Sequence, residues 1–98
     1  MRRAAKIDDS QPEIVKALEA AGACVQSLAA LGGGVPDLLV CFRDRLFLLE
    51  CKTGWRTCDR KLTKDQQRWH MAWLGPVYVV STGKEALGAV GIETGDTK

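Results

Sequence analysis

The chain has 98 residues, of which 46% are hydrophobic and 27% are charged, and its formal net charge is +2. This length allows one domain with one hydrophobic core, expected over about residues 8–90, and the composition excludes disorder over most of the chain. No apolar run approaches the roughly 20 residues that span a bilayer, so we expect a cytoplasmic protein without membrane contact.

The first helix is expected to begin at Ser10, with Pro12 in its first turn, and to end at Gly22. Ser10-x-x-Glu13 has the spacing of a capping box, in which the Glu13 carboxylate accepts a hydrogen bond from the Ser10 backbone N–H. A second interpretation places Glu13 at an active site. That interpretation rests on a family resemblance and not on the spacing.

Residues 23–28 are predicted to form the first strand, and the glycines at 32–34 follow it. Two apolar runs, Leu38–Phe42 and Leu46–Leu49, then flank a short polar break, which is the pattern of a β-hairpin. Apolar residues occupy both faces of the second run. A sheet with helices packed on both sides is therefore expected.

The ends of this hairpin carry charged residues. If residues 43–44 form a two-residue turn, Asp37 stands opposite Glu50, and opposed Cβ atoms lie roughly 4.5–5.5 Å apart. Two carboxylates at this distance repel each other unless a proton or a cation lies between them, so the register predicts a divalent metal. Lys52 shares a face with Glu50 because side chains alternate along a strand. A three-residue turn would instead place Asp37 opposite Cys51, with Glu50 diagonal to it.

The segment Thr53–Leu62 is expected to be a basic loop. This loop and its flanks carry six basic residues: Lys52, Arg56, Arg60, Lys61, Lys64 and Arg68. Together with an exposed Trp55, such groups suit phosphate contacts and base stacking, so we expect them to bind DNA. The alternative is a solvated loop whose tryptophan folds back into the core.

The next helix is predicted to begin after Thr63, because Thr63-x-x-Gln66 again has capping-box spacing. Trp69 and Trp73 share one face of this helix with Gln66 and are expected in the core. His70 is expected to be a surface residue or a partly packed residue, not a ligand.

Gly75-Pro76 is expected to end that helix, and Val77–Ser81 is predicted as a buried strand. Thr82-x-x-Glu85 caps a short last helix that ends near Val90. The chain then reads helix, strand, strand, strand, helix, strand, helix. This order predicts an α/β sandwich with a mixed four-stranded core sheet flanked by helices.

One set of residues resembles a known family. Pro36-Asp37, a spacer of twelve residues (38–49) and Glu50-Cys51-Lys52 resemble the PD-(D/E)xK nuclease signature. Cys51 stands at the x position, where an aliphatic residue is expected. Only the backbone carbonyl of this residue would be needed at a metal, so a cysteine at this position is compatible with the signature.

Three further features surround that signature: Glu13 in the first helix, the glycines at 32–34, and Lys61-Leu62-Thr63 followed by Gln66. With them the chain resembles the VRR-NUC (virus-type replication-repair nuclease) branch over roughly residues 8–85. The resemblance implies a restriction-endonuclease-like fold. It also implies a standalone phage or bacterial protein that acts as a homodimer on branched DNA such as four-way junctions.

The expected activity is metal-dependent hydrolysis of a DNA phosphodiester. Asp37, Glu50 and the backbone carbonyl of Cys51 would bind Mg²⁺ or Mn²⁺, because hard cations take oxygen ligands. The resemblance adds Glu13 as a further acidic ligand, bound to the metal directly or through water.

Lys52 would hold or help to deprotonate the attacking water, or stabilise developing charge, and Gln66 would orient the water or a phosphate. A different class of protein remains open at this point. In a non-catalytic nucleic-acid-binding module, Lys52 would form a structural salt bridge with Glu50 or Asp37. A nuclease subunit that needs a partner protein is the third possibility.

Overall fold

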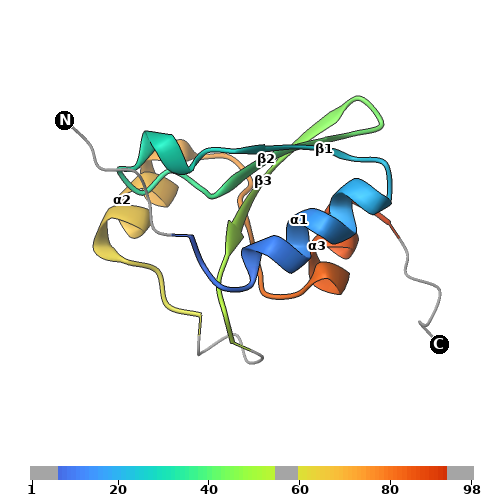
Figure 1. The fold of residues 1–98 in the computed structure, drawn as a ribbon. Helices are drawn as coiled ribbons and strands as arrows, with labels where there is room; N and C mark the ends of the chain where they lie inside the picture. The colour runs from blue at the N-terminus through green and yellow to red at the C-terminus, as the bar shows by residue number, and fades with distance from the viewer. Residues whose placement is uncertain (1–6, 55–59, 93–98) are drawn as a thin grey trace.

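The structure, a computed structural model, describes residues 7–54 and 60–92 of the chain. Those residues form a mixed α/β fold of one four-stranded sheet and three α-helices. In chain order the elements are α1 (Gln11–Ala20), β1 (Cys24–Ser27), a 3-10 helix (Ala29–Leu31), β2 (Leu38–Phe42), β3 (Arg45–Cys51), α2 (Lys64–Trp73), β4 (Tyr78–Val80) and α3 (Gly83–Ala89) (Figure 1). This order confirms the predicted one and adds the 3-10 helix.

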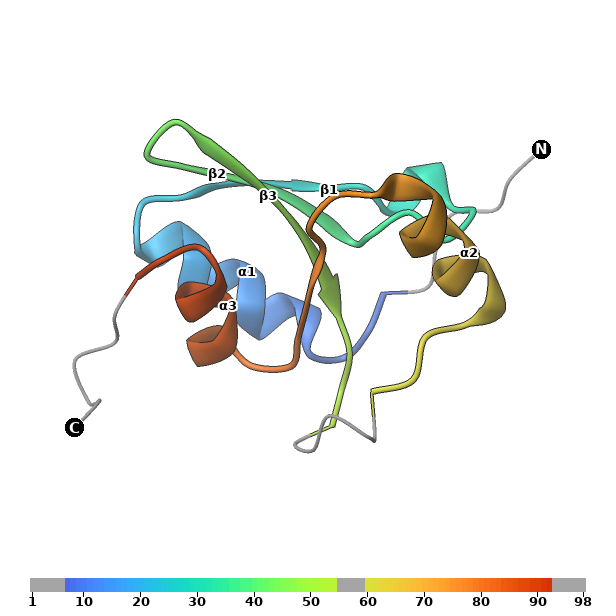
Figure 2. The same ribbon diagram turned by 180° about the vertical axis from the view of Figure 1, so that it is seen from behind.

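The strands lie in the order β1-β2-β3-β4, with antiparallel pairing throughout except between β3 and β4, which are parallel. The predicted mixed sheet is therefore confirmed. Parallel neighbours need a crossover connection, and α2 lies in the connection between β3 and β4. As a result α2 lies on one side of the sheet, whereas α1 and α3 lie together on the other side (Figures 1 and 2).

The turn of the β2–β3 hairpin sets the register that brings the charged residues together. Arg43 and Asp44 have φ angles of 53° and 64°, as a two-residue type I′ turn requires. Phe42 consequently pairs with Arg45, and the ladder continues to the pair Leu38–Leu49. The predicted two-residue register is confirmed, and the three-residue alternative is excluded.

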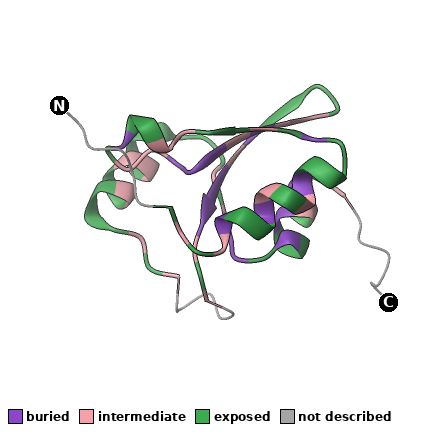
Figure 3. Ribbon diagram, viewed as in Figure 1, coloured by how far each residue is buried: buried purple, intermediate pink, exposed green. Residues whose placement is uncertain are grey.

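The hydrophobic core lies between one face of the sheet and the helices α1 and α3. Ile14 and Leu18 of α1 are fully buried against Leu38 and Leu49 of the hairpin. Figure 3 shows the buried residues along β3 and on the two helices. Burying side chains of this size contributes roughly 1.5–3 kcal/mol each, so this face supplies most of the stability.

The opposite face of the sheet is only partly covered, so the prediction of a sheet buried on both sides is partly wrong. Leu46 is 70% exposed there. The prediction that the tryptophans of α2 belong to the core is also wrong, because none of the residues of α2 is buried. Trp69 and Trp73 instead stack on each other, with ring centroids 4.7 Å apart. β4 is shorter than expected, and its Tyr78 is exposed.

Two of the three predicted helix caps are present. The Thr63 side chain accepts from the Gln66 backbone N–H as predicted, and Thr82 caps α3 in the same way. The capping box predicted at Ser10 is wrong, because the Ser10 side chain makes no cap hydrogen bond to the helix. Within residues 7–54 and 60–92, no helix has both the length and the apolar character needed to cross a membrane.

Candidate active site

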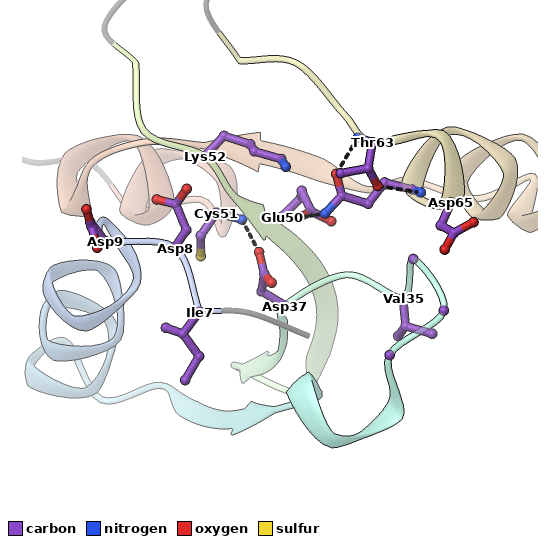
Figure 4. A pocket seen from close by; sticks show the side chains of 14 residues that line it. Ile7, Asp8, Asp9, Val35, Asp37, Glu50, Cys51, Lys52, Thr63 and Asp65 are labelled. Carbon is purple, nitrogen blue, oxygen red and sulfur yellow. Dashed lines mark hydrogen bonds between the residues drawn. The ribbon is translucent and has the colours of Figure 1, made fainter. Parts of the chain in front are cut away.

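A cavity of about 490 Å³ opens where the N-terminal segment, the glycines at 32–34, the end of β3 and the start of α2 meet (Figure 4). Its charged lining residues are five carboxylic acids and one lysine: Asp8, Asp9, Asp37, Glu50, Asp65 and Lys52. The chain as a whole is slightly basic, so this concentration of acidic groups is local. It favours a cation inside the cavity.

Asp37 and Glu50 both line this cavity, and both are buried, at 6% and 1% exposure. Asp37 Oδ2 accepts a hydrogen bond of 2.6 Å from the backbone N–H of Cys51, directly after Glu50. Burial, the charge of Asp37 and a hydrogen bond with Asp37 raise the pKa of Glu50 to about 9. Ionisation of Glu50 beside Asp37 is therefore disfavoured at neutral pH unless a cation compensates the added charge.

Glycine at position 34 allows α2 to approach this pair. Gly34 has a φ of +86°, and a Cβ at this position would overlap the backbone carbonyl of Asp65 in the first turn of α2. The close approach lets Gln66 reach the hairpin, where its Nε2 donates to Glu50 Oε2 at 3.0 Å. Only glycine combines the left-handed backbone with the space that this contact needs.

Gln66 completes the predicted capping box and also reaches the buried carboxylate. Its Oε1 accepts from the Thr63 backbone N–H at 2.8 Å, which completes the capping box, and its Nε2 holds Glu50. The cap fixes the rotamer of Gln66, so the amide is presented to the carboxylate with little freedom.

Lys52 lines the same cavity, with its side chain extended toward Glu50 (Figure 4). Its backbone N–H donates to the Val80 carbonyl at 2.9 Å, which continues the contact between β3 and β4 past Cys51. Among the ion pairs of the described residues, none includes Lys52. The structural salt bridge expected for a non-catalytic module is therefore not observed.

Glu13 does not reach the cavity, and both interpretations of it are corrected. Its Oε2 accepts a hydrogen bond of 3.1 Å from the backbone N–H of Gly83, the first residue of α3. The carboxylate therefore links α1 to the N-terminus of α3, where a negative charge is favourable. A Cβ at Gly83 would lie 2.8 Å from the Ala17 Cβ, so the glycine permits this close helix pair.

Asp8 is the acidic residue that the sequence did not reveal. Its carboxylate accepts hydrogen bonds from the backbone and hydroxyl of Ser10 and from the backbone and hydroxyl of Thr53. Although burial acts to raise it, these hydrogen bonds lower the pKa of Asp8 to about 2. Asp8 therefore ties the N-terminal segment to the residue that follows Lys52. The Asp8-x-Ser10 turn is a local signal, but nothing local indicates the contact with Thr53.

The predicted DNA-binding residues fall into three groups. Trp55 and Arg56 lie outside the described residues. Arg60 is 9% exposed in its side chain, donates to the Gly54 carbonyl and pairs with Glu85 at 2.8 Å. It stabilises the structure and is not placed to meet DNA, which corrects the prediction for this residue. The remaining three are exposed: Lys61, Lys64 and Arg68.

The carboxylate oxygens of the cavity are donors of the kind that hard divalent cations take. In the described part of the chain no group of three or more His, Cys, Asp or Glu side chains is arranged to hold a metal. The predicted ligands are only two carboxylates and the Cys51 carbonyl, and Mg²⁺ can be bound through one or two carboxylates because it keeps several waters and takes substrate phosphates. Among the described residues, the buried Glu50 Oε1 has no hydrogen-bond partner, as expected for an oxygen beside a cation site.

No protein-family model, no curated protein and no solved structure matches this chain. The chemistry of the cavity is therefore the basis for inferring a function.

Proposed function

We propose that this protein is a Mg²⁺- or Mn²⁺-dependent DNA endonuclease of the PD-(D/E)xK type, related to the VRR-NUC branch and with a restriction-endonuclease-like fold. The observation that carries the proposal is the pair of buried carboxylates, Asp37 and Glu50, in an acidic cavity that also contains Lys52. Buried like charges are costly unless a cation binds between them, and they rarely occur without a function.

Asp37, Glu50 and the Cys51 carbonyl would hold the cation. A bound divalent cation supplies Lewis-acid chemistry: it lowers the pKa of water and offsets negative charge on the phosphate. Lys52 donates hydrogen bonds to the attacking water or to the phosphate oxygens, and its positive charge stabilises the negative charge that develops. Gln66 keeps the Glu50 carboxylate in place through its 3.0 Å hydrogen bond.

DNA would approach along the start of α2. Lys61, Lys64 and Arg68 are exposed there, and Thr63 and Asp65 between them line the cavity. Arg68 lies 3.5 Å from Asp65 in an exposed pair, which is weak and easily exchanged for a phosphate contact. A basic border around an acidic centre holds the DNA backbone while the cation occupies the centre.

We further propose a homodimer acting on branched DNA. Leu46, on the same face of β3 as Glu50, and Trp73 and Leu74 at the end of α2 are exposed apolar side chains that a second copy would cover. A two-fold axis would present two centres to the two-fold symmetry of a four-way junction. Sedimentation equilibrium of the wild type beside Leu46→Glu tests this: loss of a wild-type dimer supports it, and a monomeric wild type at all concentrations contradicts it.

Cleavage of labelled DNA tests the activity. Four-way junction, flap, linear duplex and single-stranded substrates are incubated with Mg²⁺, Mn²⁺ or EDTA, using wild type, Lys52→Ala and Lys16→Ala. Lys16 is an exposed lysine of α1 that does not line the cavity, so it controls for the loss of one positive charge. We expect metal-dependent cleavage that is lost in Lys52→Ala, remains in Lys16→Ala and is strongest on branched DNA.

Binding and cleavage of the same substrates, measured together, separate the alternatives. Binding of DNA without cleavage under any metal condition would contradict the enzyme and favour a non-catalytic module or a subunit that needs a partner. Equal cleavage by wild type and Lys52→Ala would show that Lys52 has no part in the mechanism and would contradict the proposed PD-(D/E)xK nuclease.

A further inference from the structure

A histidine of α2 lies against the buried carboxylate without an evident structural reason. His70 Nε2 is 3.7 Å from Glu50 Oε1, just beyond hydrogen-bond distance. Both atoms are buried and lack a hydrogen-bond partner among the described residues. Two unpartnered polar atoms this close together, one of them on a proposed metal-ligating carboxylate, are candidates for a contact that forms when the centre is loaded.

The geometry of α2 supports this interpretation. Gln66 and His70 are four residues apart, so their side chains lie on one face of the helix, one turn apart. Gln66 Nε2 donates to Glu50 Oε2, and His70 Nε2 lies next to Oε1. Each oxygen of the carboxylate thus has its own nitrogen from the same helix.

We propose that His70 is a positioning residue whose Nε2–H donates to Glu50 Oε1 and, together with Gln66, fixes the carboxylate for a divalent cation. This inference rests on the proposed nuclease function. A carboxylate offers about four acceptor positions, so two donors from α2 leave room for a cation. The Nε2–Oε1 separation has to shorten by only about 0.7 Å to become a hydrogen bond.

The orientation of the His70 side chain differs from that of a histidine on the helix surface that points to solvent. The His70 side chain retains 18% exposure, yet its Nε2 is directed inward to an acid and not toward solvent. Either nitrogen of a neutral imidazole ring can carry the hydrogen, so Nε2 can act as the donor. A neutral ring suits a hydrogen-bond donor that does not repel a cation.

Metal binding by the full chain tests the inference. The Mn²⁺ dissociation constant is measured by titration calorimetry for wild type, His70→Ala, His70→Gln and Met71→Ala, and cleavage is followed against Mn²⁺ concentration. Met71 is 79% exposed on the same helix and controls for truncation there. Hydrogen bonds to a metal-ligating group are worth roughly 10–100-fold in metal affinity.

We expect His70→Ala to weaken Mn²⁺ binding about tenfold, with kcat at saturating Mn²⁺ largely kept. His70→Gln, whose amide can also donate, should regain most of the affinity, and Met71→Ala should match wild type. Unchanged affinity in His70→Ala, or equal weakening in the alanine and glutamine variants, would overturn the role of His70 alone. A wild type that binds no Mn²⁺ would overturn the proposed nuclease itself.

Discussion

Glu50→Gln should stabilise the metal-free protein, which is the opposite of what most substitutions of a buried residue do. The pKa of Glu50 rises from its ordinary 4.5 to about 9 on folding, chiefly through burial and then through Asp37. Between these two values the native state binds more protons than the unfolded state. The free energy of unfolding therefore falls as pH rises through this window, by up to 1.36 kcal/mol per pH unit.

The size of the stability difference depends on where the pH of the experiment lies between the two pKa values. At pH 7.5 the carboxyl lies about three units above its unfolded pKa, so keeping it protonated in the fold costs about 4 kcal/mol. Glutamine preserves the shape of the side chain, and its carbonyl can still accept from Gln66. We therefore expect Glu50→Gln to unfold with a free energy about 2–4 kcal/mol higher than wild type at pH 7.5, and within about 1 kcal/mol of it at pH 5.

Urea unfolding in EDTA at the two pH values measures this difference. Glu85→Gln is the matched control, because the hydrogen bonds from Arg60 and Ser81 outweigh burial and lower the pKa of Glu85. This substitution removes a favourable carboxylate and should destabilise the protein. Added Mn²⁺ should raise the stability of wild type at pH 7.5 and leave Glu50→Gln unchanged, since binding to the native state alone adds stability.

A Glu50→Gln variant less stable than wild type at pH 7.5 without metal would contradict the raised pKa of Glu50. That outcome would mean that Glu50 is ionised and already satisfied by the protein. A cation would then have no electrostatic role in this cavity, and a metal centre would no longer be expected there.

Three further predictions concern the surroundings of the cavity. Asp8→Asn should destabilise the fold by about 1 kcal/mol above pH 4, measured by thermal unfolding, with the difference from wild type vanishing as pH falls toward 2. Gly34→Ala should cost about 2–4 kcal/mol, because φ is positive and the new Cβ meets α2; unchanged stability and cleavage would contradict the close approach. Lys61→Ala combined with Lys64→Ala should lower the slope of log K against log salt for DNA binding by about two, and an unchanged slope would remove both from the interface.

The features that could be predicted from the sequence are those that short-range chemistry decides. The turn at Arg43 and Asp44 fixed the hairpin register, and with it the opposition of Asp37 and Glu50. The cap at Thr63 depends on four consecutive residues and was also predicted. In each case the interacting groups are close in the chain or are connected by one regular strand pair.

The features that could not be predicted depend on the packing of distant segments. Asp8 meets Thr53 across 45 residues, and Glu13 meets Gly83 across 70. The spacing of Ser10 and Glu13 suits a local cap, but a helix N-terminus offered by α3 competed successfully for the carboxylate. The periodicity that suggested a buried face on α2 likewise says nothing about whether another element covers that face.

The hairpin strand β3 couples the stability of the protein to its proposed chemistry. Leu49 and Cys51 point into the core shared with α1 and α3, whereas Glu50 between them points to the other side, toward α2. A slip of one residue would bury the carboxylate in the core and expose Leu49, so the hydrophobic pattern itself enforces the position of Glu50. The core therefore determines the geometry of the cavity. The side chains of Asp37, Lys52 and Gln66 are not part of that core. For this reason substitutions of those three residues should remove activity while the fold is retained.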